Sequence, residues 1–434
     1  MLVYVLKQNG QPLMPTHNGA KVRVLLKHKR AKVVSKCPFT IKLLYESTNF
    51  TQPLTLGIDT GSKYVGSAII NDVTAEILYE SQLELRDDIK SKIDKRRQFR
   101  RVRRNKLRYR PSRFDNRKAS KRKNRYTPTL ISKFQGHTRE IEFIKSILPV
   151  TDVVLEVGEF DPQLLQDPTL VFHKWDYAEG ELYQQENYKQ ATRARDNYTC
   201  QCCGKKNCRL EVHHLLPRSR GGSDKLANLI TLYTDCHHLA HSSEEQLLAF
   251  QKKFGKKAKG TLNYSTQMNV LRHMLQKEYR DAEVTYGFIT KEMRRVFRLD
   301  KSHMIDACCI ASRGLEFHNN NLNNYKKKCV PKGDYARTSV CRGKFVILPK
   351  GKVAGFKRYD KVLYNGKEYF VAGRMSAGYI YLVDIDNNRI QTERTKRSTG
   401  EKYMSKAKIK VSVVKKITNA KSYVYVKDNQ GVSR

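Results

Sequence analysis

The stretch from Cys200 to His241 concentrates side chains that bind metals and move protons. It holds five of the ten cysteines of the chain, a histidine pair at His213 and His214, and a second histidine cluster that ends at His241. Hydrolysis of a phosphodiester needs one group that holds a divalent cation and another that deprotonates a water molecule. Histidine suits the second task because its pKa lies near neutrality. The stretch therefore predicts a metal-dependent site that cleaves a nucleic-acid backbone.

The spacing within this stretch suggests separate roles. Because neighbouring residues on a strand point to opposite faces, His213 and His214 can serve one site only where the strand is distorted or a metal lies at its edge. Asn228 can fix a loop or orient the base through its amide. His237, early in the next predicted helix, can close the metal site, and His241 lies one turn on, at i+4. A surface cluster of structural histidines is the alternative.

A second set of candidate ligands is spread along the chain. Asp59 ends the apolar run LTLGIDT, and Glu156 lies in a second apolar run, VVLEVGE. His303 and Asp306 are three residues apart on a predicted helix, so they share a face. Three acids and a histidine that converge can hold two magnesium ions about 4 Å apart for displacement at phosphorus. A GIDTG turn also holds phosphate in actin-like and sugar-kinase ATPases, and this alternative stays open.

The elements around these residues predict several small domains. Apolar runs predict three strands between residues 54 and 85, the opening of a mixed sheet. Further helices are expected over 127–149, 264–279 and 302–315, and further strands over 152–160 and 282–290. Residues 1–52 indicate short strands, with turns at Asn9-Gly10 and Asn18-Gly19. Residues 326–434 have all-β texture, with a hairpin at Asn365-Gly366.

Residues 86–125 are the most basic part of the chain. They carry 20 Lys and Arg against four acids, and RRQFRRVRRNKLRYR has high helix propensity up to Pro111. A helix this charged repels itself unless phosphates lie along it, so we expect an arginine-rich helix embedded in nucleic acid. A disordered basic tail is the alternative. The candidate nucleic-acid-binding residues are Arg96, Arg97, Arg100, Arg101, Arg103, Arg104 and Arg108.

The overall charge points to the same partner. The formal net charge is +42, from 84 basic and 42 acidic residues, and a polyanion offsets the resulting self-repulsion. No apolar run approaches the roughly 18 residues of a spanning helix, and the N-terminus is too short and polar for a signal peptide. We therefore expect an intracellular, nucleic-acid-bound protein with roughly two to four domains. Clustered cysteines in a reducing compartment favour metal over disulfides.

The histidine-rich stretch resembles the HNH nuclease family, a ββα-metal fold. The pattern is HH-x-x-P, then GG, then NL, then CH-x-x-x-H, in that order. The resemblance implies that His214 is the general base and that His213 and His237 hold one magnesium ion. It also implies that Asn228 is the asparagine of the HNH motif. HNH modules of this type often carry two CxxC knuckles around a structural zinc.

The knuckles of this chain depart from that pattern. Cys200-x-x-Cys203 is the first CxxC pair. In the second pair, Tyr233 occupies the position of the first cysteine, so Cys236 is its only cysteine. Zinc in a closed structural site takes four ligands. Cys200, Cys203 and Cys236 give three, and Cys202, Cys208 or His238 stays open as the fourth.

The second set, taken in order, is similar to a RuvC-type RNase H fold cut into three sections. Asp59 matches the first catalytic carboxylate, Glu156 the second, and His303 with Asp306 the third; the resemblance implies two magnesium ions there. The order of an arginine-rich helix and then an HNH module between the sections is typical of the type II CRISPR effector nucleases and of the smaller IscB proteins. The QPLMPT run, from Gln11 to Thr16, and the length of the chain favour IscB.

The IscB resemblance implies a multidomain α/β architecture with a split RuvC-like RNase H fold. The expected parts are an N-terminal module (1–52), RuvC section I (53–85), a bridge helix (86–125), RuvC section II (126–165), an inserted ββα-metal HNH domain (166–250), RuvC section III (251–325) and a β-rich domain that contacts guide RNA and a target-adjacent DNA motif (326–434).

The function that this resemblance implies is RNA-guided DNA cleavage by a monomer in the prokaryotic cytoplasm. A guide RNA pairs with one strand of double-stranded target DNA; His214 then cuts the paired strand and the Asp59 site the displaced strand. Three rivals stay open: a guide-free HNH endonuclease of the homing or restriction kind, a non-catalytic RNA-binding scaffold, and a dimeric junction resolvase.

Overall fold

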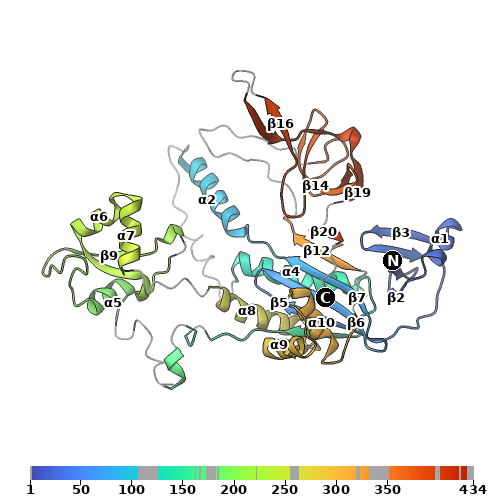
Figure 1. The fold of residues 1–434 in the computed structure, drawn as a ribbon, viewed down its shortest axis with the longest axis horizontal. Coiled ribbons are helices and arrows are strands. Elements are labelled where there is room, and N and C mark those ends of the chain that lie inside the picture. The colour runs from blue at the N-terminus through green and yellow to red at the C-terminus, as the bar shows by residue number, and fades with distance from the viewer. Residues whose placement is uncertain are drawn as a thin grey trace. The chain divides into compact units, whose positions relative to one another are not determined.

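The structure is a computed structural model, and the protein is a multidomain α/β chain (Figure 1). Two compact units emerge, one of Met1–Gly158 with Leu271–Arg434 and the other of Glu159–Val270; we call them unit 1 and unit 2. Among the described residues, no helix is both long and apolar enough to cross a membrane. The structure describes residues 2–105, 126–161, 163–165, 168–172, 182, 185–220, 222–254, 263–318, 323–331, 351–395, 401–419 and 422–427.

A seven-stranded mixed sheet forms the centre of unit 1, in the order β11-β8-β5-β6-β7-β12-β20. Strands β5 to β7 form the antiparallel meander expected from the sequence, and β8 runs parallel to β5. All of β5 except its last residue is buried, as expected for a strand covered on both faces. The strands are β5 Leu54–Thr60, β6 Tyr64–Asn71, β7 Ile77–Glu84, β8 Asp152–Glu156, β11 Glu283–Thr285, β12 Asn324–Cys329 and β20 Tyr423–Lys427.

Helix α10, His303–Ser312, packs across β5 and β6 (Figure 1). Two strand glycines allow this close approach. A Cβ on Gly57 would lie 2.3 Å from the Ala307 carbonyl oxygen, and a Cβ on Gly66 would lie 1.7 Å from that of His303. Both distances are far below van der Waals contact, so a side chain at Gly66 would push the start of α10 off the sheet, and one at Gly57 would push off its middle.

A buried ion pair joins the opposite face of the sheet to helix α4, Pro128–Lys145. The Lys327 ammonium on β12 donates to both Glu140 carboxylate oxygens, at 2.7 and 2.8 Å, and to the Tyr79 hydroxyl at 2.6 Å. Lys327 and Glu140 are fully buried, and the ammonium lies 4.1 Å from the centroid of the Phe143 ring. A pair this deep depends on both partners, because removing one leaves an uncompensated charge.

The N-terminal module is a four-stranded sheet in the order β2-β1-β4-β3. The expectation of strands only was wrong for residues 19–27, which form helix α1, Gly19–Lys27. The Asn18 side chain accepts from the Lys21 backbone N–H at 2.8 Å, and this cap starts a helix where the β-branched residues had favoured a strand. The strands are β1 Val3–Leu6, β2 Pro12–Thr16, β3 Ala31–Lys36 and β4 Phe39–Leu43.

The expected all-β texture of the C-terminal region is confirmed in a five-stranded sheet, β18-β15-β14-β13-β19. Asn365 and Gly366 both have positive φ, 48° and 74°, which suits the predicted hairpin. The boundary expected at residue 326 falls inside β12, and β12 and β20 belong to the central sheet. The remaining strands are β13 Lys361–Tyr364, β14 Lys367–Met375, β15 Tyr379–Val383, β16 Gln391–Thr395, β17 Lys402–Lys406, β18 Ile409–Lys410 and β19 Lys415–Thr418.

The predicted arginine-rich helix is present as α2, Ile89–Asn105. Arg96, Arg97, Arg100, Arg101 and Arg104 are all exposed on it. The side chain of Arg103 and the whole of Arg108 lie outside the described part of the chain. With its arginines exposed, α2 lacks the apolar stripe by which a helix packs against a hydrophobic core.

Unit 2 holds a short antiparallel hairpin, β9 Leu210–His214 with β10 Leu229–Tyr233, followed directly by helix α6, Thr234–Ser242. This is a ββα arrangement. Its small core contains Leu215, Leu232, Ala240 and Phe250. The other helices of unit 2 are α5 Tyr188–Arg195 and α7 Glu244–Phe254, and α8 Asn263–Glu278 leads back to unit 1, where α9 is Gly287–Val296.

Candidate active sites

Three histidines of unit 2 form a ligand cluster. The ring nitrogens of His213, His237 and His241 lie within 4.8 Å of one another. His213 is 1% exposed, and neither of its ring nitrogens has a hydrogen-bond partner. Burial, and then the neighbouring histidines, lower the pKa of His213 to about 4. A buried, neutral imidazole without a partner fits a metal ligand, because a bound cation would supply the missing interaction.

The other two ligands come from one face of α6. His237 and His241 are four residues apart, so they lie one turn apart on that helix. The Glu211 carboxylate of β9 lies 2.8 Å from Nδ1 of His237, the kind of contact that fixes the ring orientation of a ligating histidine. In the sequence, His241 lies one helical turn after His237, but we had given it no role as a ligand. The structure places it in one cluster with the two predicted ligands, His213 and His237.

His214 has a different environment from its neighbour. Its Nε2 lies 2.8 Å from Asp224 Oδ1, which also accepts from Arg218 Nε at 2.6 Å. An Nε2–H that donates to Asp224 leaves Nδ1 as the nitrogen that can accept a proton. The predicted base and the predicted ligand therefore lie on different sides of β9, as the alternation of a strand requires.

Asn228 makes all its hydrogen bonds with loop backbone. Its Nδ2 donates to the carbonyl oxygens of Leu216 at 2.9 Å and Ser223 at 2.7 Å, and its Oδ1 accepts from the Leu216 N–H at 2.8 Å. A Cβ on Gly222 would lie 1.8 Å from the Leu216 carbonyl oxygen, so the loop closes tightly. Of the two roles considered for Asn228, these contacts favour fixing the loop that follows His214.

A second cluster in unit 2 consists of Cys200, Cys203 and Cys236, whose sulfur atoms lie within 4.8 Å of one another. Burial acts to raise the pKa of Cys200, but backbone N–H donors around it lower the pKa to about 7. Thiolates at this spacing fit zinc. Within the described residues, the open fourth candidates Cys202, Cys208 and His238 lie outside this cluster.

The acid site of unit 1 brings together the four residues expected there. Asp59 and Glu156 are register partners at the ends of the parallel strands β5 and β8. His303, at the start of α10, places Nδ1 2.6 Å from Asp59 Oδ2. Asp306 lies one turn further along α10. Carboxylates that meet at the carboxyl ends of neighbouring parallel strands offer the oxygen ligands that magnesium prefers.

The electrostatics of the acid site favour a cation. Burial, and then the charges of Asp59 and Asp306, raise the pKa of Glu156 to about 7 against the hydrogen bond that lowers it. Burial also raises the pKa of Asp306. The hydrogen bond to Asp59 raises the pKa of His303. Acids that disfavour one another's charge in a buried site fit magnesium, because the ion would offset the repulsion.

Helix α9 contributes residues that the sequence analysis missed. The Thr290 hydroxyl donates to Glu156 Oε2, and Arg294 Nε lies 2.8 Å from Asp306 Oδ1. A Cβ on Gly287 would lie 3.1 Å from Glu156 Oε1. The strand expected over 282–290 was wrong after residue 285, because β11 ends there and α9 begins at Gly287. Thr290 and Arg294 are four residues apart, which places them on one face of a helix. This spacing is the sequence feature that could have revealed them.

Two family profiles match the chain. The family described as RRXRR protein matches residues 3–180, and the family described as HNH endonuclease matches residues 200–243. The chain is an IscB-like protein. The run Arg100-Arg101-Val102-Arg103-Arg104 of α2 spells the RRXRR motif, and the HNH match covers the histidine site and the three-cysteine cluster.

Individual proteins resemble parts of this IscB-like chain. A segment of 62 residues is 32% identical to Anaredoxin of Nostoc sp. strain PCC 7120 and covers 14% of this chain and 82% of that protein, so the segment and Anaredoxin belong to one family. Streptococcus thermophilus Cas9, solved in complex with the AGAA PAM, matches with a TM-score of 0.35 and 15% identity over 57% of this chain. The complex with AGGA PAM gives 0.34 and 14%. The chain spans 32% of the length of those Cas9 chains.

Proposed function

We propose that this protein is an RNA-guided, metal-dependent DNA endonuclease that makes a double-strand break. The histidine site cuts the strand paired with the guide, and the acid site cuts the displaced strand. The observation that carries the proposal is the cluster of three histidines in unit 2, whose ring nitrogens lie within 4.8 Å of one another beside His214. In unit 1, the register pair Asp59 and Glu156 next to His303 supports a second site. The match to the HNH endonuclease family supports the first site.

In the histidine site, His213, His237 and His241 would hold one divalent cation. A cation there offsets charge on the scissile phosphate and on the leaving oxygen. His214 accepts the proton of the attacking water at Nδ1, and Asp224 stabilises the imidazolium that forms. Asn228 keeps the loop after His214 in place. Removing the Asp224 carboxylate would weaken the base without touching a ligand.

In the acid site, Asp59, Glu156 and Asp306 would hold two magnesium ions, which supply charge stabilisation for the attacking and leaving oxygens. We assign this site to a split RuvC-like RNase H fold, with its three sections on β5, β8 and α10. The hydrogen bond from Nδ1 to Asp59 orients His303 and raises its pKa. His303 therefore accepts a proton at Nε2 more readily than a free imidazole.

The nucleic-acid partners follow from charge. The exposed arginines of α2 would contact the phosphates of the guide RNA and of the target DNA. Through the IscB resemblance, the β-rich region would contact the guide RNA and a target-adjacent DNA motif. We place the protein in the prokaryotic cytoplasm as a monomer. The test is whether a structured RNA co-purifies and whether its free segment then directs cleavage.

The decisive experiment uses two single variants of the RNA-loaded protein. We expect H214A to nick only the displaced strand and D59A to nick only the paired strand, measured on duplexes labelled on each strand. H238A is the matched control, because His238 lies outside the ligand cluster. Loss of both cuts in either folded variant would disprove two independent sites. Site-specific cleavage by RNA-stripped protein would instead support a guide-free endonuclease.

The three-cysteine cluster would hold a structural zinc that stabilises unit 2. Metal analysis should find one zinc per chain in the purified protein and none in C236S, whereas C208S should keep the metal. Equal zinc in all three proteins would rule out this cluster as the site.

A further inference from the structure

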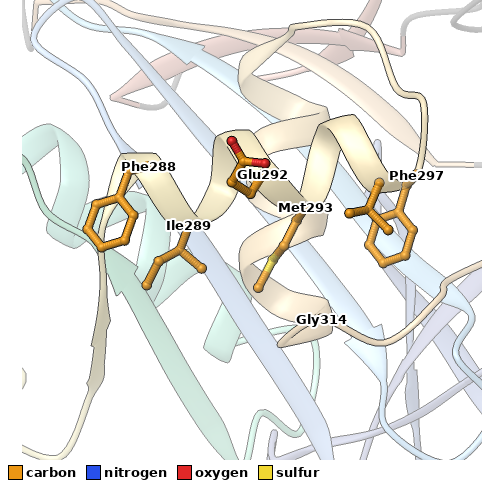
Figure 2. Close-up of a pocket in the computed structure, with 7 residues that line it drawn as sticks. Phe288, Ile289, Glu292, Met293, Phe297 and Gly314 are labelled. Atoms are coloured by element: carbon orange, nitrogen blue, oxygen red, sulfur yellow. The ribbon is translucent and has the colours of Figure 1, made fainter.

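Helix α9 has two unlike faces. One carries Thr290 and Arg294 toward the acid site, as described above. The opposite face is apolar and open to solvent: Phe288 is 68% exposed and Val296 is 74% exposed. Figure 2 shows Phe288, Ile289 and Met293 on the same side of α9, where they line a pocket of about 350 Å³. A solvated apolar face next to a catalytic centre indicates a binding surface.

Two aromatic rings lie at the end of α9 that touches the acid site. The rings of Tyr286 and Phe288 are nearly parallel, at 10°, with centroids 6.0 Å apart. Gly287 stands between them and approaches the Glu156 carboxylate so closely that a Cβ would lie 3.1 Å from Oε1. The two rings therefore flank a residue that abuts Glu156, a proposed metal ligand that Thr290 also contacts.

The charge along α9 and just after it is mixed, with an excess of basic residues. Lys291, Arg298 and Lys301 are exposed on α9 and on the segment that leads to α10, together with the acidic Glu292, which lines the pocket, and Asp300. Sites for single-stranded nucleic acid combine such basic groups with aromatic faces on which successive bases stack. A protein partner would also accept an apolar face, but the basic surroundings and the continuity with the acid site favour a nucleic-acid strand.

We infer that Tyr286 and Phe288 form a stacking platform for the bases of the single DNA strand that is cut at the acid site. The pocket along α9 receives the next base of the same strand. The inference rests on the proposed function, because it assigns the strand. Tyr286 and Phe288 act as positioning residues: stacked bases fix which phosphate lies over Asp59 and Glu156.

The first test measures single-turnover cleavage of each strand by RNA-loaded F288A. Base–aromatic stacking corresponds to a factor of about 5 to 150, so displaced-strand cleavage should fall by about ten-fold or more. Paired-strand cleavage is the internal control and should not change. F288Y should retain the rate, whereas F288L should lose it, because leucine keeps apolar volume without a ring face.

A matched aromatic control is available in the same unit. Phe50 is 87% exposed and precedes β5 at the end of that strand away from Asp59. F50A should therefore cleave both strands like the unchanged protein. A loss of displaced-strand cleavage in F50A equal to that in F288A would overturn the inference, because any exposed aromatic residue would then serve.

The second test separates stacking from a structural effect. Abasic sites are placed one at a time in the displaced strand near the scissile phosphate. Removing the stacked base should slow the unchanged protein as much as F288A does, and the two losses should not multiply when combined. Losses that multiply at every position would overturn the inference. So would self-association of the protein that F288A abolishes, since Phe288 would then bind a second copy.

The third test does not depend on cleavage. In D59A loaded with RNA and target, 2-aminopurine in the displaced strand should be quenched at one or two adjacent positions, and D59A/F288A should restore its fluorescence. Unchanged fluorescence would overturn the stacking platform. Failure of the proposed function would look different: no strand of the duplex would be cut by the unchanged protein, or D59A would leave displaced-strand cleavage intact.

Discussion

The two sites are assembled in opposite ways. The histidine site takes its ligands from one hairpin and the helix that follows it, between His213 and His241. The acid site takes Asp59, Glu156 and Asp306 from three segments that are distant in sequence and meet only in the folded sheet. One site is therefore a local structure in a small unit, whereas the other exists only after a seven-stranded sheet has formed.

The sites also differ in their charge before a metal binds. Burial lowers the pKa of His213 to about 4, so its imidazole is neutral and able to ligate at physiological pH. Burial raises the pKa of Glu156 to about 7, so its carboxylate is partly protonated there. The comparison teaches that the histidine cluster is neutral before any metal binds, whereas a cation in the acid site would offset repulsion between its carboxylates, as the proposed function requires.

The largest expected effect tests whether the histidine site needs all three of its clustered histidines. H241A removes one of three clustered ligands and should lower paired-strand cleavage by at least about 100-fold, since even partners of ligands matter by 10- to 100-fold. Strand-specific cleavage rates measure this loss, with displaced-strand cleavage as the internal reference. A rate within three-fold of the unchanged protein would mean that His213 and His237 suffice without His241.

The next effect tests whether the two units unfold separately. K327M leaves Glu140 buried without its cation and should lower the stability of unit 1 by about 3–5 kcal/mol. Hydrogen exchange should accelerate in α4 and β12 and stay unchanged in β9 and α6. K326M is the matched control, because the Lys326 side chain is 44% exposed and an ion pair open to solvent contributes about 1 kcal/mol or less. Faster exchange throughout unit 2 would contradict independent unfolding.

The smallest effect concerns the charge of the acid site. The Thr290 hydrogen bond lowers the pKa of Glu156, so T290V should raise that pKa, by about one unit or less for one hydrogen bond. Cleavage that needs the Glu156 carboxylate is lost as pH falls through this pKa. The acid limb of displaced-strand cleavage should therefore move to higher pH in T290V and stay in place in T290S. A shift in the paired-strand profile would contradict the assignment.

Local patterns in the sequence predicted one site better than the other. His213 and His237 were assigned as ligands through the HNH resemblance, which holds because a hairpin and its next helix preserve sequence order in space. The run 282–290, which ends at Thr290, was misjudged: its β-branched and aromatic residues favour a strand, whereas the structure turns at Gly287 to pack a helix against Glu156. The partner of Asp306 was therefore invisible without the tertiary contacts. Arg108, predicted to bind nucleic acid, lies outside the described residues.

The last strand of the central sheet has a consequence for how the protein is made. Strand β20 pairs with β12 at the edge of the sheet, and Tyr423 places its ring over the Lys327 ammonium. A ribosome that stalls before residue 423 releases a chain whose β12 edge is bare and whose buried lysine lacks part of its cover. Such an edge invites pairing with other chains. Incomplete translation products would therefore aggregate or be degraded rather than persist as unregulated nucleases.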